Sequence, residues 1–367
     1  MKKTKICLFL PTLRQGGGAA RVFLNLASQM ANQDIAVTII VLGNDYNEPE
    51  VPKGVIIERL HVSRALFCFF RLRKLLNRLE PDFVMSTMGH LNIVLAIVKP
   101  FVKSGPKYIA RESNTVSKRL MDQRFRRLLT VMYKFLYKNF DIVIAQSKLM
   151  ADDLVTNFNV PSHLLRVIGN PVDFLKIQEL SRSTDNIIER KAKFRIITVG
   201  RHVAQKRFDL AIEVLGLLGS DYELLILGEG PLKNDNIEFA KQKNLDDKVN
   251  FAPFKMNPFP LISSGDCYLI TSEFEGLPNA ALEALGLGLP VFGFSTTGGL
   301  PDYIDKRNGC LVDFGDVNAL AQAIKESNLI KGENICNTIK DQLSMDVICE
   351  EYLKTFSLLE KTGSDRT

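Results

Sequence analysis

One segment, residues 272–286, combines two carboxylates with a loop suited to binding anions. Its sequence is SEFEGLPNAALEALG, in which Glu275 precedes a predicted helix and Glu283 lies inside it. Pro278 suits the first turn of a helix, and the free backbone amides from Gly276 onward form an anion site. We expect both carboxylates to face one crevice and to accept hydrogen bonds from sugar and ribose hydroxyls. For Glu283 in isolation, an exposed helix carboxylate is the alternative.

Two cations follow another predicted strand. The segment VGRHVAQKR places Arg201 and Lys206 directly after the strand at 194–199. Ligands of open α/β folds bind at the carboxyl ends of the strands, where two cations can neutralise a leaving diphosphate. No Asp-x-Asp pair, the usual metal holder for a sugar nucleotide, occurs in the sequence. We therefore expect no metal and no separate cofactor at this site, with a solvated basic loop as the alternative.

Three consecutive glycines, Gly16 to Gly18, end the first predicted strand and open a helix. Glycines let backbone amides approach a phosphate or sugar closely, and the helix N-terminus adds favourable positive charge. The spacing differs from Gly-x-Gly-x-x-Gly, so no nicotinamide cofactor is indicated. A plain tight turn is the alternative.

Short apolar strands and amphipathic helices alternate along the chain, which is typical of a parallel sheet covered by helices. The predicted fold class is therefore α/β. Expected strands are 5–11, 35–42, 55–60, 82–86, 107–110, 141–145, 165–168, 194–199, 222–228, 248–252, 266–271, 290–294 and 309–312. Expected helices are 19–32, 63–79, 89–99, 119–139, 147–157, 206–218, 231–243, 257–264, 278–287, 316–326 and 345–360.

The length of 367 residues exceeds one typical hydrophobic core and accommodates two. The alternation of strands and helices stops in a polar segment, residues 173–192, where we place the domain boundary. The predicted domains are residues 1–175 and 190–344. The amphipathic segment in 345–367 can pack on either domain.

The composition indicates an ordinary globular protein of a reducing compartment. The six cysteines lie far apart, mostly inside apolar runs, and read as buried thiols. The apolar stretch at 6–11 is too short for an export signal, and no run reaches the roughly 18 to 20 apolar residues that span a bilayer. We expect a cytoplasmic protein, either soluble or on the inner face of the membrane.

Positive charge is concentrated in the first half of the chain. Residues 71–79 carry four basic residues and no acidic one, and residues 118–138 carry seven basic residues against Asp122. Within 118–138 apolar residues recur at helical spacing, which predicts a basic amphipathic helix able to lie on anionic lipid. A helix packed on the core with a solvated basic face remains an equal alternative.

Taken together, these motifs resemble those of the retaining glycosyltransferases of family 4, which have the GT-B fold, over nearly the whole chain. The matching features are the early glycine loop, Val199-Gly-Arg201 followed by Lys206, Gly228-Glu-Gly230-Pro, Glu275-Gly-Leu-Pro with Glu283 eight positions on, and Asn170-Pro-Val-Asp173. The resemblance implies an N-terminal acceptor-binding and a C-terminal nucleotide-sugar-binding Rossmann-like domain whose sheets face a central cleft. It also implies that the last helix returns to the N-terminal domain.

The resemblance assigns roles to particular residues. Arg201 and Lys206 are expected to bind the donor diphosphate, and Glu275 to contact the donor sugar. Further residues implied at the donor site are Gly16 and Gly17 across the cleft, then Gly228, Gly276, Leu277, Pro278 and, for the ribose, Glu283.

The chain departs from the family pattern in its N-terminal domain. Family members often carry His or Asp near the reacting carbon, where this chain has Ala110-Arg-Glu112-Ser-Asn114. Because these residues follow a strand, we expect Glu112 and its neighbours to reach the cleft as catalytic candidates. A protein base is not required if the leaving phosphate accepts the proton of the acceptor. His90 is another candidate cleft residue, with a capping role as the alternative.

Three functions are consistent with this sequence. The first is retaining transfer of a hexose or N-acetylhexosamine from a nucleoside diphosphate, expected to be UDP, to a lipid-linked or lipopolysaccharide- or capsule-type glycan. The second is epimerisation of a sugar nucleotide on the same fold, for which only four histidines are available. The third is a non-enzymatic basic scaffold that binds anionic lipid; no nucleic-acid motif is present.

Overall fold

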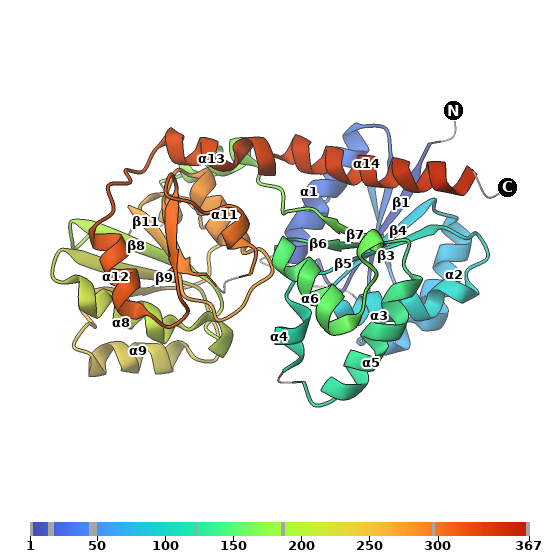
Figure 1. Ribbon diagram of the computed structural model, residues 1–367. Helices are drawn as coiled ribbons and strands as arrows, with labels where there is room; N and C mark the ends of the chain where they lie inside the picture. The colour runs from blue at the N-terminus through green and yellow to red at the C-terminus, as the bar shows by residue number, and fades with distance from the viewer. Residues whose placement is uncertain are drawn as a thin grey trace. The chain divides into compact units, whose positions relative to one another are not determined.

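The computed structural model describes residues 3–13, 18–43, 50–121, 123–184, 188–295 and 298–364 (Figure 1). The chain divides into two compact units. Unit 1 comprises Met1–Pro171 with Met345–Thr367, and unit 2 comprises Val172–Ser344. Each unit contains one parallel sheet with helices around it, which is the predicted α/β class.

Unit 1 is built on a seven-stranded parallel sheet. Its inner strand β1 (Lys5–Leu10) is buried from Ile6 onward, as expected for an apolar run covered on both faces. The strand order β3-β2-β1-β4-β5-β6-β7 reverses between β1 and β4, and such a switch point is where open α/β sheets bind ligands. The other strands are β2 (Ala36–Val41), β3 (Val55–Arg59), β4 (Phe83–Thr87), β5 (Lys107–Arg111), β6 (Ile142–Ala145) and β7 (Leu165–Val167).

Helices cover both faces of this sheet. In Figure 1, α2 (Phe69–Leu79), α3 (Gly89–Val98), α5 (Arg126–Leu136) and α6 (Lys148–Phe158) lie on one face, and α1 (Gly18–Asn32) and α14 (Met345–Ser364) on the other. The C-terminal helix α14 packs against α1, and Phe356 stacks on Phe83 with 4.9 Å between ring centroids. The shorter helices are η1 (Ala65–Phe67), η2 (Lys99–Phe101), α4 (Val116–Leu120), η3 (Tyr137–Asn139) and η4 (Ser162–Leu164).

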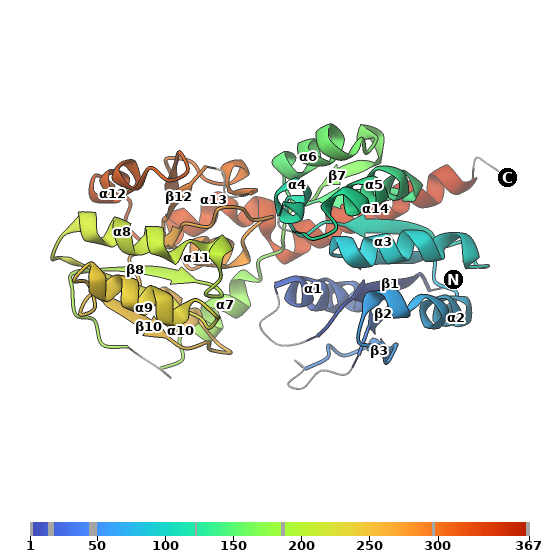
Figure 2. The same ribbon diagram turned by 90° about the horizontal axis from the view of Figure 1, so that it is seen from below.

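Unit 2 has a six-stranded parallel sheet of order β10-β9-β8-β11-β12-β13, with its switch point between β8 and β11. The strands are β8 (Phe194–Val199), β9 (Tyr222–Leu227), β10 (Val249–Ala252), β11 (Cys267–Ile270), β12 (Val291–Phe294) and β13 (Gly309–Val312). The helices are α7 (Phe174–Ser181), η5 (Ala204–Lys206), α8 (Phe208–Leu218), α9 (Lys233–Gln242), α10 (Phe259–Ser263), α11 (Asn279–Gly286), η6 (Leu300–Asp302), α12 (Val317–Lys325) and α13 (Glu333–Leu343). Figure 2 shows α8 and α9 from a second direction.

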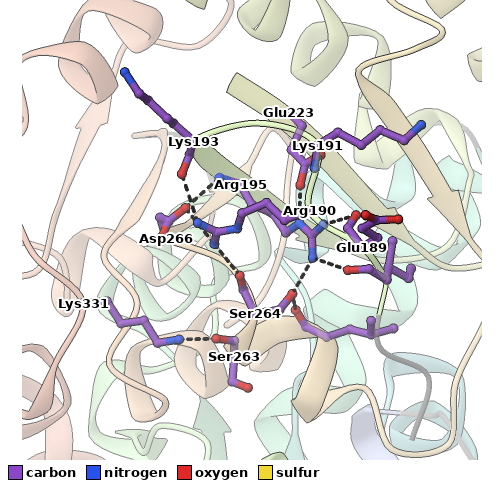
Figure 3. Close-up of polar contacts among 12 residues, drawn as sticks. Glu189, Arg190, Lys191, Lys193, Arg195, Glu223, Ser263, Ser264, Asp266 and Lys331 are labelled. Carbon is purple, nitrogen blue, oxygen red and sulfur yellow. Dashed lines mark hydrogen bonds and ion pairs between the residues drawn. The ribbon is translucent and has the colours of Figure 1, made fainter. Parts of the chain in front are cut away.

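The amino end of β8 is fixed by a buried ion pair (Figure 3). Arg195 Nε donates to Glu223 Oε1 over 2.5 Å, and the two side chains are 2% and 1% exposed. The same guanidinium donates to the backbone oxygens of Ile188 and Glu189 and to Ser264 Oγ. Because these contacts lie at the amino end of the strand, opposite the ligand-binding edge, we assign them to anchoring the segment that enters the sheet.

The division between the units falls earlier than the sequence predicts. It lies between Pro171 and Val172, whereas the predicted first domain extends to residue 175 and the predicted linker covers 173–192. The reason is α7, whose buried Phe174 and Ile177 pack within unit 2 on α10 and α11. Val172 N also donates to Leu343 O over 2.7 Å, next to the end of α13.

Two helix predictions need correction. The single helix predicted at 119–139 is divided into α4, α5 and η3, with non-helical residues on both sides of position 122. Helix α13 was not predicted, although Ile335, Ile339 and Leu343 recur at a spacing of four residues and are buried.

Candidate active site

An ion pair joins two loops at the switch point of unit 2. Lys206 lies after β8 and Glu275 after β11, the two strands between which the sheet order reverses. Lys206 Nζ is 2.6 Å from Glu275 Oε1, and the side chains are 21% and 13% exposed. A cation and a carboxylate are thus held at the edge of the sheet where ligands bind.

Neighbouring hydrogen bonds fix the positions of these two loops. Gln205 Nε2 donates to Phe274 O over 2.7 Å, and Glu273 N donates to Gln205 O over 2.9 Å. Thr271 Oγ1 donates to Lys206 O over 3.1 Å. Because hydrogen bonds join the two loops, the ion pair is pre-organised and does not depend on two mobile side chains.

Gly200 makes room for the Lys206 side chain. A Cβ atom at position 200 would lie 2.9 Å from Lys206 Cε, so a larger residue would displace the aliphatic stem. Gly228 has φ of 150° and lies close to Gly200. A Cβ atom at position 228 would lie 1.8 Å from the carbonyl oxygen of Gly200. The glycines of the two motifs therefore allow close approach of the loops after β8 and β9.

Arg201 is the most accessible of the predicted site residues. Its side chain is exposed and makes no hydrogen bond or ion pair with other residues in the described ranges. The adjacent His202 is fully buried, and burial lowers its pKa, with Lys233 as a further cause. His202 N donates to Glu229 O and His202 O accepts from Leu232 N, both over 3.0 Å, so the loop that carries Arg201 is firmly attached.

The predicted anion loop begins α11. The helix starts at Asn279, one residue later than expected, with Pro278 in extended conformation before it. Gly276, Leu277 and Pro278 are buried, and Glu283 in the helix is 8% exposed. Glu283 is therefore not the exposed helix carboxylate of the alternative interpretation.

Glu275 and Glu283 share one neighbour, Tyr268 of β11. Burial, and then the negative charges of these two carboxylates, raise the pKa of the Tyr268 hydroxyl. The hydroxyl accepts a hydrogen bond from Val199 N over 3.3 Å. Both carboxylates therefore act electrostatically on the same buried hydroxyl, and that they face one crevice stays a prediction.

Sequence reasoning missed a second glycine pair next to this loop. Gly299 N donates to Gly276 O over 2.6 Å. Gly298 has φ of 57°, and a Cβ there would lie 2.2 Å from Gly276 O, so only glycine fits. The signal was present as consecutive glycines shortly after the strand at 290–294.

In unit 1, the prediction that Glu112 reaches the ligand site is contradicted. Its side chain is 1% exposed, its Oε1 accepts from Asn92 Nδ2 over 2.8 Å, and the Tyr137 hydroxyl donates to the same oxygen. Burial raises the pKa of this carboxyl group, opposed by the hydrogen bonds from Tyr137 and Asn92. A buried carboxylate with internal partners is not placed to exchange protons with a substrate.

Arg111 is buried on the opposite face of the same sheet, at 1% exposure. Its guanidinium donates to Asn170 Oδ1 over 2.6 Å, Tyr352 Oη over 2.9 Å and Thr87 Oγ1 over 3.4 Å. The reason is strand alternation: successive side chains point to opposite faces, and both faces are covered by helices at this position. Asn114, two residues after Glu112, has a buried Oδ1 atom that accepts no hydrogen bond from the described residues.

The remaining sequence predictions concern the early glycines, His90, a metal site and membrane-spanning helices. Gly16 and Gly17 lie outside the described residues. His90 is exposed as the second residue of α3. Within the described ranges, no three His, Cys, Asp or Glu side chains cluster as metal ligands would, and no helix combines the length and apolarity of a membrane span.

Comparison with protein families gives matches over both units. Residues 16–174 match the model of Glycosyltransferase Family 4, and residues 181–341 match that of Glycosyl transferases group 1. The two matches together account for most of the chain and include every predicted donor-site residue.

Individual proteins are similar over most of their length. An N-acetylgalactosamine-N,N'-diacetylbacillosaminyl-diphospho-undecaprenol 4-alpha-N-acetylgalactosaminyltransferase of Campylobacter jejuni is 27% identical over 333 residues, covering 88% of this chain and 89% of that protein. A lipopolysaccharide core biosynthesis glycosyltransferase of Rhizobium meliloti is 23% identical, covering 92% and 95%. The crystal structure of HepE from Anabaena in complex with UDP superposes with a TM-score of 0.77 at 16% identity, covering 96% and 99%. The fold of this chain is accordingly GT-B, as predicted.

Proposed function

The chain is a glycosyltransferase of family 4, and on that premise we propose that it transfers a hexose or N-acetylhexosamine from a UDP-sugar to a lipid-linked or lipopolysaccharide-type glycan, with retention of anomeric configuration. The observation that carries this proposal is the Lys206–Glu275 pair at the switch point of unit 2, with the exposed guanidinium of Arg201 on the same loop as Lys206.

The two cations are proposed to hold the donor diphosphate. Lys206 is only 21% exposed, so its charge is less screened by solvent than that of a surface lysine. When the bond between the anomeric carbon and the phosphate oxygen breaks, negative charge develops on the leaving phosphate, and Lys206 and Arg201 stabilise it. In this proposal they supply the charge that a divalent metal supplies in other sugar-nucleotide enzymes.

The carboxylates are proposed to orient the donor. Glu275 accepts hydrogen bonds from hydroxyls of the sugar, and its ion pair with Lys206 couples the position of the sugar to that of the phosphate. Glu283, at 8% exposure on α11, accepts from the ribose hydroxyls. The amides at the start of α11 face the same anion.

The reaction balances without a protein base. The acceptor hydroxyl attacks the anomeric carbon on the face from which the phosphate leaves, its oxygen forms the new glycosidic bond, and its proton passes to the leaving phosphate oxygen. This route gives retention, and it is compatible with the burial of Glu112, which leaves that carboxylate unable to take the proton.

Donor and acceptor are proposed from the relatives. UDP is the nucleotide in the HepE complex, and the names of the two sequence relatives refer to a diphospho-undecaprenol-linked glycan and to the lipopolysaccharide core. Such donors and the five buried cysteines suit a cytoplasmic enzyme. The epimerase and scaffold alternatives are not favoured by these relatives.

The test is turnover of UDP-sugars with short lipid-linked or lipopolysaccharide-type acceptors in the presence of EDTA. We expect release of UDP and a product with the anomeric configuration of the donor, determined from the coupling constant of the anomeric proton. Thermal shifts with UDP, GDP and ADP should show selective stabilisation by UDP. Inversion at the anomeric carbon, or loss of turnover in EDTA with recovery on adding Mg²⁺, would contradict the mechanism proposed.

A further inference from the structure

Helix α5 has two apolar faces, and only one of them packs against the core of unit 1. Tyr133 is buried, and Leu129, Met132 and Leu136 pack against the hydrophobic core of unit 1. Leu128, Val131 and Phe135 point away from it and are 59%, 50% and 69% exposed. A helix on a globular surface needs a single apolar stripe, so folding of unit 1 does not account for the second one.

Basic side chains flank the exposed stripe. Residues 123–138 contain Arg124, Arg126, Arg127, Lys134 and Lys138 and no acidic residue. All of these except Lys134 are exposed. Asp122, directly before this segment, is the one acidic residue within 118–138. An apolar stripe bordered mainly by positive charge is the pattern of a helix that lies in the interface of an anionic bilayer.

A second exposed apolar group lies on the same side of the sheet. Around the start of α2, Leu66, Phe67 and Phe70 are 76%, 66% and 76% exposed, and Phe101 of η2 is 52% exposed. Phe69 links this group, with ring centroids 5.1 Å from Phe70 and 5.3 Å from Phe101. Helix α3 contacts both α2 and α5, and Figure 1 shows the three helices on one face of the sheet.

This second group is also bordered by positive charge. Residues 64–79 contain five basic side chains, and residues 97–107 contain three, without an acidic residue in either segment. Of these eight, Arg78 and Lys99 are paired with Glu58 and Asp141 on neighbouring elements. Exposed aromatic side chains beside arginine and lysine can insert at the level of the lipid headgroups while the cations contact the phosphates.

We propose that these two groups form a docking surface for an anionic phospholipid bilayer, with α5 as its main element. The inference rests on the proposed function in one respect, because a lipid-linked acceptor resides in a membrane and docking of unit 1 would bring the enzyme to it. Charge complementarity selects the bilayer as the occupant, since a second copy of this chain would bring the same positive charges together.

The test is co-sedimentation of the full-length protein with vesicles of phosphatidylcholine alone and of phosphatidylcholine mixed with phosphatidylglycerol. We expect binding to the mixed vesicles only, weakening as salt is added. The double variant Leu128→Ser/Phe135→Ser should lower the partition coefficient at least about tenfold because it removes inserted apolar area. Arg124→Gln/Arg127→Gln should lower it by about fivefold per charge removed.

The matched control is Leu175→Ser/Ile330→Ser, which removes two apolar side chains of unit 2 that are 82% and 85% exposed. It should bind vesicles as the wild type does. Circular dichroism and stabilisation by UDP, measured on every variant, separate loss of docking from loss of folding or of donor binding.

Three outcomes would overturn the inference: equal binding to both kinds of vesicle, unchanged binding by Leu128→Ser/Phe135→Ser, and a dimer in light scattering that this variant abolishes while no vesicles are bound. Failure of vesicle binding with UDP stabilisation intact would leave the proposed function standing. Vesicle binding without any response to UDP would instead count against the proposed function.

Discussion

Arg111 ends β5 in unit 1 and Glu112 follows it, much as Arg201 and Lys206 follow β8 in unit 2, yet the two pairs have different environments. The first pair is fully buried and bonded to residues of unit 1. In the second, Arg201 is exposed and Lys206 is partly exposed beside Glu275. The position of a charged residue after a parallel strand is therefore insufficient to identify it as a ligand contact.

What separates the two positions is the packing around them. β8 lies at the switch point of its sheet, which is where open α/β sheets bind ligands, and Arg201 and Lys206 after it keep exposed surface. β5 lies one strand beyond the switch point of unit 1, and α3, η3 and α14 supply partners for Arg111 and Glu112 at its end. We expect charged residues of the first kind to affect the reaction and those of the second kind to affect stability.

The largest effect is expected for Lys206→Ala. Removing this cation should lower kcat/KM at least about 100-fold, or roughly 3 kcal/mol of transition-state stabilisation, because the leaving phosphate loses a preorganised positive charge. The unfolding transition should change little. Steady-state kinetics with a UDP-sugar measure the effect, and Lys241→Ala, an exposed lysine of α9 in the same unit, is the control. Activity within tenfold of wild type would show that Lys206 is not the main diphosphate contact.

The opposite pattern is expected for Arg111→Met. The substitution removes the guanidinium that donates to Asn170 Oδ1 and Tyr352 Oη, and the loss of a hydrogen bond by a buried polar group costs about 1–3 kcal/mol. We therefore expect unit 1 to lose about 3 kcal/mol of stability while the affinity of unit 2 for UDP is unchanged. Tyr352→Phe should reproduce roughly a third of the loss.

Hydrogen exchange resolves the two units in this experiment. Backbone amides of β5 and α14 should exchange faster in Arg111→Met, and those of β8 and β9 should keep the wild-type rate. If UDP affinity falls while exchange in unit 1 is unaffected, Arg111 has a role at the ligand site and the comparison drawn above is incorrect.

The sequence was informative where chemistry and local geometry coincide. Gly200, Arg201, Lys206 and Glu275 were predicted to lie at one site because glycines, cations and carboxylates follow the ends of strands, and the structure brings Lys206 and Glu275 within 2.6 Å of each other. The parallel sheets could be predicted because strands buried on both faces are continuous apolar runs.

Other features depend on contacts between distant segments, which one sequence does not reveal. The burial of Arg111 requires Tyr352, 241 positions away, and that of Glu112 requires Tyr137 and Asn92. The helicity of 174–181 depends on packing against α10 and α11, so a polar composition alone suggested a linker. The second apolar face of α5 was likewise visible only once its core-facing residues were known.

The smallest effect, and the sharpest probe of unit 1, is the pH dependence of Glu112→Gln. Because burial raises the folded-state pKa of Glu112 above its usual 4.5, the unfolded chain releases this proton first as pH rises. The contribution of Glu112 to wild-type stability should therefore be fully present below about pH 4.5 and be lost towards the folded pKa, by at most about 1.4 kcal/mol per pH unit. Gln keeps the acceptor oxygen for Tyr137 and does not titrate, so the variant should gain stability relative to wild type as pH rises. The measurement is urea unfolding followed by circular dichroism at several pH values. The transition to follow is the unfolding of unit 1, which is the one that Arg111→Met shifts. The control is Glu350→Gln, at an exposed position of α14. A difference between variant and wild type that is independent of pH would mean that Glu112 titrates normally despite its burial, and would weaken the contrast with Glu275.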